Sequence, residues 1–344
     1  MKKILSVALA VVMLFAVVAL AGCDKKAETL KFGLGVVASY GEAKNAEGET
    51  NGQGEFNTTA VAVLLDAEGK IVAIDLDTAQ IKPTWTADGK KVDVTDFRTK
   101  YEKGTDYGMA AYGYDKNGDE KVLEWNEQAD AFMATAKGKT VAEVKAFAGE
   151  DGYATGDLAT AGCTIVVTDF IAALEKAVAN AVDSAATAEN KLNVALVTSA
   201  SYSNKDAAED ADGMNQVDTT IVAAVTDADG KVVVAKTDCT QGKISFNAKG
   251  EATYDAKAAV QTKLELGENY GMAAYGTKHD GSEGKVLEWD AQAAEFDKAL
   301  VGKTATDFAA LAGADTYATG DLATAGCTMA IGDMIKAAEA AAKA

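Results

Sequence analysis

The string YATGDLATAGCT runs from Tyr153 to Thr164, and the same twelve letters return from Tyr317 to Thr328. The sequence on either side of the strings differs between the two copies, so the identity is local. Such a duplication predicts two copies of one module that keep one feature in common. We therefore expect an α+β fold with two homologous tandem domains, residues 30–182 and 191–344, joined by a linker at 183–190.

Strand patterns precede each string. Residues 30–40 predict a strand, and each copy then contains a strand–turn–strand pattern, at 58–65, 66–69 and 70–76 in the first copy and at 219–226, 227–230 and 231–236 in the second. Both turns close on a glycine, which favours a tight hairpin. Each domain is therefore expected to contain an antiparallel sheet.

Helical patterns follow each hairpin. Apolar residues at helical spacing predict a core-facing helix in each copy: Trp125, Ala129, Phe132 and Met133, then Trp289, Ala293, Phe296 and Leu300. Gly138 and Gly302 are placed to end these helices, and Thr140 and Thr304 to start a short second one. A brief strand at 164–167 and a last helix capped by Thr168 complete the first copy, so helices are expected to pack on each sheet.

The first residues have the pattern of a bacterial lipoprotein signal. Lys2 and Lys3 precede an apolar run at 4–20, and Leu-Ala-Gly-Cys ends at Cys23. We expect residues 1–22 to be a signal peptide, Cys23 to be lipidated and 23–29 to be a tether. The chain is then lipid-anchored on the extracellular face of the cell membrane. The alternative is an uncleaved membrane helix, for which about 17 apolar residues is the short limit.

Composition narrows the class of function. The net charge of −19 would repel nucleic acid, so no nucleic-acid partner is expected. His279 is the single histidine, so a histidine-based catalytic or metal site cannot occur in both copies. Cys163 and Cys327 hold the same place in the two copies, which favours small buried residues over disulfide partners. We predict no catalytic residues and no metal site.

Two repeated segments are candidates for ligand contact. The loop 156–164 combines an acid, hydroxyls and small residues, and its amides could hold a phosphate. The alternative is a tight turn preserved for packing. The segments 107–113 and 270–276 carry two tyrosines and two glycines each, and could approach a flat ligand. Their alternative is a strand and turn with half-buried aromatics.

Motifs in both copies are shared with a known family. They are Val122-Leu123-Glu124-Trp125 with Gln128-Ala129, Gly138-Lys139-Thr140-Val141, Asp157-Leu158-Ala159, Cys163-Thr164-Ile165 and Thr168-Asp169-Phe170, and then Glu288-Trp289, Gly302-Lys303-Thr304, Asp321-Leu322-Ala323, Thr328 and Asp333. With the lipoprotein signal, these motifs resemble the Gram-positive extracellular electron-transfer flavoproteins. Members of that family are surface lipoproteins with two FMN-binding-type domains.

The resemblance implies a covalent cofactor. In that family a separate flavin transferase, using Mg²⁺ and FAD, esterifies FMN through its phosphate to the last residue of an Asp-x-x-Ser/Thr-x-x-Thr pattern. Carried over by residue, the acceptors are Thr164 and Thr328, and the motif acids are Asp157 and Asp321, which gives two FMN groups per chain. Here each threonine comes seven positions after its aspartate rather than six, because a cysteine holds the sixth place. A one-residue bulge would reconcile the spacing.

The resemblance also ranks the neighbouring side chains. Thr160 and Thr324 are the fallback hydroxyls for attachment. Tyr112 and Tyr275 are candidates to stack on the flavin, as are Trp125 and Trp289, although helical spacing favours a core position for the tryptophans.

The implied function is electron transfer without substrate turnover. Electrons would pass from a membrane NADH dehydrogenase and the quinone pool, through the flavins, to extracellular acceptors, and the flavin would supply the redox chemistry. One alternative is a cofactor-free surface lipoprotein that binds a small ligand or a peptide. The third interpretation is a structural or adhesive repeat protein. It is weaker, because such proteins are usually built from more than two repeats.

Overall fold

The computed structural model describes residues 28–117, 122–275 and 286–343. The expected signal peptide, Cys23, most of the expected tether and His279 lie outside these residues. Within the described ranges, no helix combines the length and apolarity that a membrane crossing requires.

The first half of the chain supplies one large sheet, one small sheet and the helices around them. Its strands are β1 (Lys31–Tyr40), β2 (Gly52–Gln53), β3 (Phe56–Leu65), β4 (Ile71–Ile81), β5 (Thr84–Trp85), β6 (Lys91–Val92) and β7 (Val182–Asp183). Its helices are α2 (Lys100–Lys103), the 3-10 helix η1 (Gly104–Tyr107), α3 (Met109–Asn117), α4 (Trp125–Ala136), α5 (Val141–Lys145), α6 (Gly156–Thr160) and α7 (Thr168–Ala179).

The second half has a corresponding order of elements. Its strands are β8 (Lys191–Ala200), β9 (Gly213–Thr226) and β10 (Val232–Phe246). Its helices are α8 (Lys263–Leu266), the 3-10 helices η2 (Gly267–Tyr270) and η3 (Ala305–Leu311), α10 (Trp289–Leu300), α11 (Gly320–Thr324) and α12 (Gly332–Lys343). The α+β fold class is thereby confirmed.

Each of the two predicted hairpins supplies an edge strand and the neighbouring inner strand of one large antiparallel sheet. The sheet orders are β4-β3-β1-β7 in the first half and β10-β9-β8 in the second, with β2, β5 and β6 in the small sheet. Gly69 and Gly230 close the two turns with φ of 77° and 74°, in the left-handed region that favours glycine. In each turn an aspartate side chain accepts the backbone N–H groups, so the turn chemistry is set locally.

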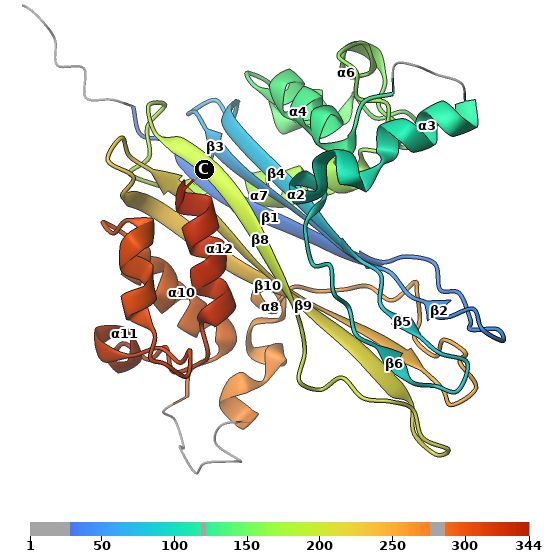
Figure 1. Cartoon of the computed structure of the whole chain (residues 1–344). Coiled ribbons are helices and arrows are strands. Elements are labelled where there is room, and N and C mark those ends of the chain that lie inside the picture. The colour runs from blue at the N-terminus through green and yellow to red at the C-terminus, as the bar shows by residue number, and fades with distance from the viewer. Residues whose placement is uncertain (1–27, 118–121, 276–285, 344) are drawn as a thin grey trace, which may run out of the picture.

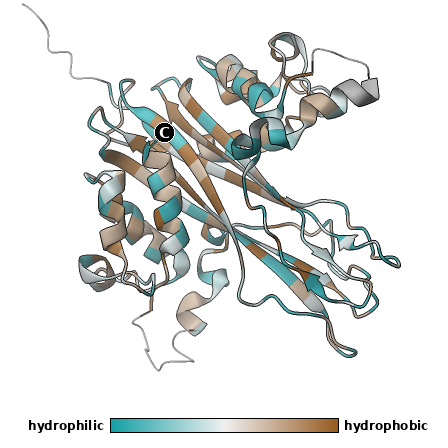
Figure 2. Cartoon of the chain, viewed as in Figure 1, coloured by the Kyte–Doolittle hydropathy of each residue, from teal (hydrophilic) through white to brown (hydrophobic). Residues whose placement is uncertain are grey.

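The two large sheets pack face to face, and helices cover their outer faces (Figure 1). Helix α7 packs on β1 and β3, and α12 packs on β8 and β9. Between the sheets, apolar side chains from both halves form one buried cluster, visible as brown strands in Figure 2. Each sheet therefore depends on the other to bury its inner face, and a division into two separate domains stays a prediction.

Most predicted helix features are confirmed. Trp125, Ala129 and Phe132 form the buried face of α4. Gly138 and Gly302 follow α4 and α10 with φ of 77° and 78°. Thr140 and Thr304 each form a capping box with an acid three residues later, at the start of α5 and of η3.

Three local predictions are wrong. Residues 107–113 form η1 and the start of α3 rather than the strand and turn of the alternative interpretation, because the side-chain carboxylate of Glu124 accepts the Met109 N–H at the helix start. The expected strand at 164–167 is reduced to one isolated bridge, Tyr153 with Val166. Thr168 is the first residue of α7, and the N-cap position belongs to Val167, whose side chain cannot cap.

The segment expected to be a polar linker is also structured. Within it, β7 pairs with β1, and the Leu30 N–H donates to the Ala186 carbonyl at 2.8 Å. Ala186 is fully buried among the apolar side chains between the sheets. The composition was misleading because small residues suit close packing as well as flexibility.

Candidate functional site

The two copies of the repeated string adopt the same compact loop. Each begins with a backbone bridge, Tyr153 to Val166 in the first copy and Tyr317 to Ala330 in the second. A one-turn helix follows, α6 or α11, and the chain then reverses at Gly162 (φ 104°) or Gly326 (φ 108°).

Both the backbone conformation at Gly162 and the close approach of a neighbouring side chain favour glycine at this position. Its φ is in the region that side chains rarely adopt, and a Cβ there would lie 2.7 Å from Cδ1 of Leu123. Gly326 has the same relation to Leu287, with 2.6 Å. Part of the identity of the strings therefore has a packing cause.

A buried glutamine holds each loop in place. The Gln128 Oε1 accepts the Thr164 N–H at 2.7 Å, while its Nε2 donates to the Leu123 carbonyl at 2.8 Å and to the Met109 sulfur at 3.3 Å. Gln292 makes the corresponding bonds to Thr328, at 2.8 Å, and to Leu287 and Met272. One side chain therefore ties the loop, the segment before α4 and the start of α3 together.

A glutamate completes the same connection. The Glu124 carboxylate accepts the Met109 N–H at 2.9 Å, and the Glu288 carboxylate accepts the Met272 N–H at 2.8 Å. Glu124 also begins α4 and shares a capping box with Glu127. The helix that carries Tyr112 is thus oriented by the helix that carries Gln128.

The predicted acceptor threonines end the loops with exposed side chains. Thr164 and Thr328 are exposed, while the amide of each is fixed by its glutamine. The Thr164 hydroxyl has a long contact of 3.4 Å to Gln128 Oε1. Both hydroxyls are therefore accessible from solvent on a backbone that is held in position.

The fallback hydroxyls are used differently. Thr160 Oγ1 donates to the Gly156 carbonyl at 3.0 Å, and Thr324 Oγ1 donates to the Gly320 carbonyl at the same distance. Each hydroxyl thus completes a single turn of helix. This engagement makes Thr160 and Thr324 weaker candidates for attachment than the threonines that end the loops.

The predicted motif acids lie at the other end of the loop. Asp157 and Asp321 are exposed in the first turn of α6 and of α11, where a carboxylate is favourable. In the described part of the chain, neither carboxylate makes a hydrogen bond or an ion pair with another side chain. No contact brings Asp157 to Thr164 among these residues.

The cysteines beside the threonines are buried, as predicted. Cys163 and Cys327 are fully buried and free, and burial raises the pKa of each thiol to about 11. A thiol with this pKa is protonated at neutral pH and is a poor nucleophile. The side chain before each threonine therefore packs in the core while the threonine itself faces solvent.

The aromatic candidates divide into exposed tyrosines and buried tryptophans. Tyr112 is 62% exposed and Tyr275 is 65% exposed. Trp125 and Trp289 belong to the core, and each has a lysine ammonium 5.3 Å from its ring centroid. Of these four side chains, only the two tyrosines are exposed at the surface.

Sequence reasoning missed the two glutamines as site residues. Gln128 and Gln292 lie 36 positions before their threonines in both copies, so a repeated offset was the available signal. It also missed Tyr153 and Tyr317, which open the strings, are about half exposed and form a backbone bridge with the residue two positions after each threonine.

The two loops are placed far apart in the architecture. Helix α6 and helix α11 lie at opposite ends of the molecule, with the paired sheets between them (Figure 1). The structure therefore presents two separate candidate sites rather than one composite site.

Comparison with known proteins gives one partial similarity. No family model matches the chain, and no solved structure matches it. The chain is 30% identical over 132 residues to the chlorophenol reductase of Desulfitobacterium hafniense. The alignment covers 35% of this chain and 38% of that protein, so this chain spans about two fifths of the length of the curated relative that it matches.

Proposed function

We propose that this protein has a redox-related role, and more specifically that it carries electrons on two FMN groups esterified to Thr164 and Thr328. The observation that carries the proposal is the pairing of an exposed threonine hydroxyl with an amide fixed by a buried glutamine, in both copies. Such a threonine is open to a modifying enzyme and then keeps its attached group in a defined place.

The spacing of the motif is compatible with this role. The extra residue between Asp157 and Thr164 falls in the reversal at Ala161 and Gly162, where the chain makes a tight turn. The residue at the family's usual position, Cys163, is buried and inaccessible. In the proposal, this turn would serve as the one-residue bulge that reconciles the spacing of the motif.

The residues around each loop fit a flavin in part. FMN would supply the one- and two-electron chemistry, and its phosphate would form the ester. Tyr112 and Tyr153, or Tyr275 and Tyr317, offer exposed aromatic rings on the elements tied to the loop. The chain itself would attach, orient and shield the group, which needs no catalytic residue of its own.

The expected partners follow from this role and remain part of the proposal. A flavin transferase would modify the threonines, a membrane NADH dehydrogenase and the quinone pool would reduce the flavins, and extracellular acceptors would oxidise them. A lipid on Cys23 would hold the protein at the outer face of the membrane. The similarity to a protein named as a reductase supports the redox part of the proposal and leaves the substrate open.

Intact mass spectrometry tests the attachment. The protein is exported by a host that supplies the flavin transferase, alongside Thr164→Val, Thr328→Val and the double variant. We expect two FMN-sized additions on the wild type, one on each single variant and none on the double variant. Thr160→Val and Thr324→Val are matched controls that should keep both additions.

An unmodified mass would contradict the proposal if the same host modifies a known flavoprotein. The second candidate function would then be favoured, a cofactor-free surface protein that binds a small ligand. Its specific support is a cavity between the two sheets that neither loop reaches.

A further inference from the structure

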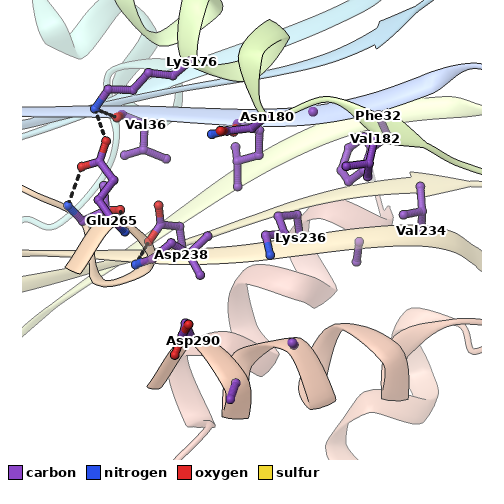
Figure 3. Close-up of a pocket in the computed structure, with 17 residues that line it drawn as sticks. Phe32, Val36, Lys176, Asn180, Val182, Val234, Lys236, Asp238, Glu265 and Asp290 are labelled. Atoms are coloured by element: carbon purple, nitrogen blue, oxygen red, sulfur yellow. Dashed lines mark hydrogen bonds and ion pairs between the residues drawn. The ribbon is translucent and has the colours of Figure 1, made fainter. Parts of the chain in front are cut away.

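The cavity lies at one edge of the paired sheets. Its volume is about 640 Å³, which suits a small organic molecule. Figure 3 shows side chains of β1 on one long side and side chains of β10 on the other, with Glu265 of α8 at one end and Asp290 of α10 beyond β10. Apolar side chains form most of the walls, among them Phe32, Leu34, Val36 and Val234.

The opposite edge of the sandwich has the same construction but is closed. There β4 faces β8, and the Asp75 carboxylate accepts the Val194 N–H at 2.7 Å. This hydrogen bond crosses from one half of the chain to the other. A carboxylate therefore fills the gap between the two edge strands.

The two edges can be compared residue by residue. Asp77 accepts the Tyr101 N–H at the start of α2, and Asp238 accepts the Leu264 N–H at the start of α8, so these aspartates occupy equivalent places. Two residues earlier, β4 has Asp75 and β10 has Lys236. Leu34 on β1 is correspondingly the equivalent of Val194 on β8, since both pair with matching positions of the central strands.

The cavity edge is therefore lined by hydrogen-bond donors from both β1 and β10. The Leu34 and Val36 carbonyls accept from Asn180 and Lys176, at 3.2 Å and 2.9 Å. In an antiparallel strand the N–H of a residue points the same way as its carbonyl, so these residues also direct N–H groups toward this edge. Lys236 adds an ammonium, and neither kind of donor can satisfy the other.

Two of the three acids that line the cavity already have partners of their own. Glu265 pairs with Lys176 at 2.5 Å. Asp238 accepts the Cys239 and Leu264 N–H groups. Asp290 lies in the first turn of α10. Lys236 makes no hydrogen bond or close ion pair with any described residue, and its charge acts at longer range on Asp297.

We propose that this cavity binds an apolar molecule that ends in a carboxylate. The ligand carboxylate would lie between the Lys236 ammonium and the N–H groups of β1, as the Asp75 carboxylate lies against β8 at the other edge. Its apolar part would contact Phe32, Val36 and Val234. A peptide strand fits less well, since the Leu34 and Val36 carbonyls that it would need are already engaged. The site is independent of the FMN proposal, because neither repeated loop lines it.

Isothermal titration calorimetry of the purified protein with decanoate tests the site. Decyltrimethylammonium, which has the same chain and the opposite charge, is the comparison ligand. The net charge of −19 favours the cation at long range, so a preference for decanoate must come from a local site. We expect saturable binding of one decanoate, at least tenfold tighter than binding of the cation.

Two substitutions at one position locate the carboxylate. Lys236→Gln removes the charge and should weaken decanoate binding about tenfold or more, which is the loss of one charge-assisted hydrogen bond. Lys236→Asp introduces the residue type that the closed edge has at the equivalent position, Asp75. It should abolish binding, because its carboxylate would repel that of the ligand. Lys231→Gln, an exposed lysine before the same strand, should leave binding unchanged within about twofold.

Three results would overturn the proposal: absence of saturable decanoate binding to the wild type, equal binding of the cation, or unchanged binding by Lys236→Gln. The first two need no variant, so a folding defect in a variant cannot obscure them. Far-UV circular dichroism checks that the variants are folded. Loss of FMN attachment would not affect any of these outcomes.

Discussion

The two repeated loops keep the same hydrogen bonds, whereas the two edges of the paired sheets differ. Gln128 and Gln292 hold their loops through matching donors and acceptors. Asp75 closes one sheet edge, and Lys236 leaves the other open. A loop fixed by one buried side chain tolerates little change, because a lost partner leaves buried polar groups unsatisfied. An edge open to solvent tolerates a change of charge, and the two halves have diverged there.

The largest expected effect concerns how closely a helix packs on each edge strand. A Cβ added at Gly35 on β1 would meet the Ala173 carbonyl of α7, whereas β8 carries Ala195 at the corresponding place under α12. Gly35→Ala should cost about 3 kcal/mol or more, because helix backbone must move. Ala195→Gly should cost about 1 kcal/mol through chain entropy. Urea denaturation of both variants measures the difference, and equal costs would mean that the two helices pack alike.

The next effect tests whether the two loops are held equally. Gln128→Ala and Gln292→Ala should each lower the free energy of unfolding by about 2–3 kcal/mol, because each removes a fully buried side chain and leaves a partly buried N–H and a partly buried carbonyl without a partner. Gln261→Ala, at an exposed position, should stay within about 0.5 kcal/mol. Guanidinium denaturation gives all three values. A large cost for only one of the two buried glutamines would show that the loops are not equivalent.

A smaller difference in stability is expected between substitutions at the closed edge and substitutions at the open edge of the paired sheets. Asp75→Ala should cost about 2 kcal/mol, since the hydrogen bond between its carboxylate and the Val194 N–H is lost. Lys236→Ala should change stability by less than about 0.5 kcal/mol, because this side chain has no close partner in the described residues. Thermal unfolding of the two variants checks the contrast. Equal costs would remove the distinction on which the cavity proposal depends.

The smallest effect is a pH dependence that compares the two equivalent buried aspartates. Burial raises the pKa of Asp77 to about 7 and that of Asp238 to about 6. In the unfolded chain both titrate near their ordinary value of about 4. Between pH 4 and 7 the folded state therefore binds more protons, and the free energy of unfolding falls as pH rises.

Asp297, whose pKa burial also raises to about 6, adds to this fall, whereas the lowered pKa of Glu55 opposes it, and we expect a net fall of about 1 kcal/mol. Asp77→Asn should remove more of the pH dependence than Asp238→Asn does, since its pKa is further from the ordinary value. Urea denaturation at pH 4.5 and 7.5 measures both. A stability that rises across this window in the wild type, with no change in the variants, would contradict the expectation.

Local patterns were predictable where the cause is local. Hairpin turns, the stripe of Trp125, Ala129 and Phe132, and the capping box at Thr140 depend on residues a few positions apart, and the structure confirms them. Burial of Cys163 was also expected, because a cysteine at the same place in both copies favours a small core residue.

Other features depend on contacts between distant residues. Residues 109–117 are helical because Glu124 caps their first turn, and residues 182–183 form a strand because β1 offers them a free edge. Neither partner is visible in the local sequence. The glutamines were overlooked for the same reason, since a buried amide gains its role only when Thr164 and Leu123 meet around it.

The sequence by itself determined that two copies of one α+β pattern follow each other, where their turns and helix ends lie, and which threonines end the repeated loops. These features follow from periodicity, turn chemistry and repetition, which act over short distances. Only the tertiary structure decided that the two sheets share one core and that one edge is closed while the other is open. That outcome depends on which strand each side chain faces, and a carboxylate can bridge to a backbone N–H where an ammonium cannot.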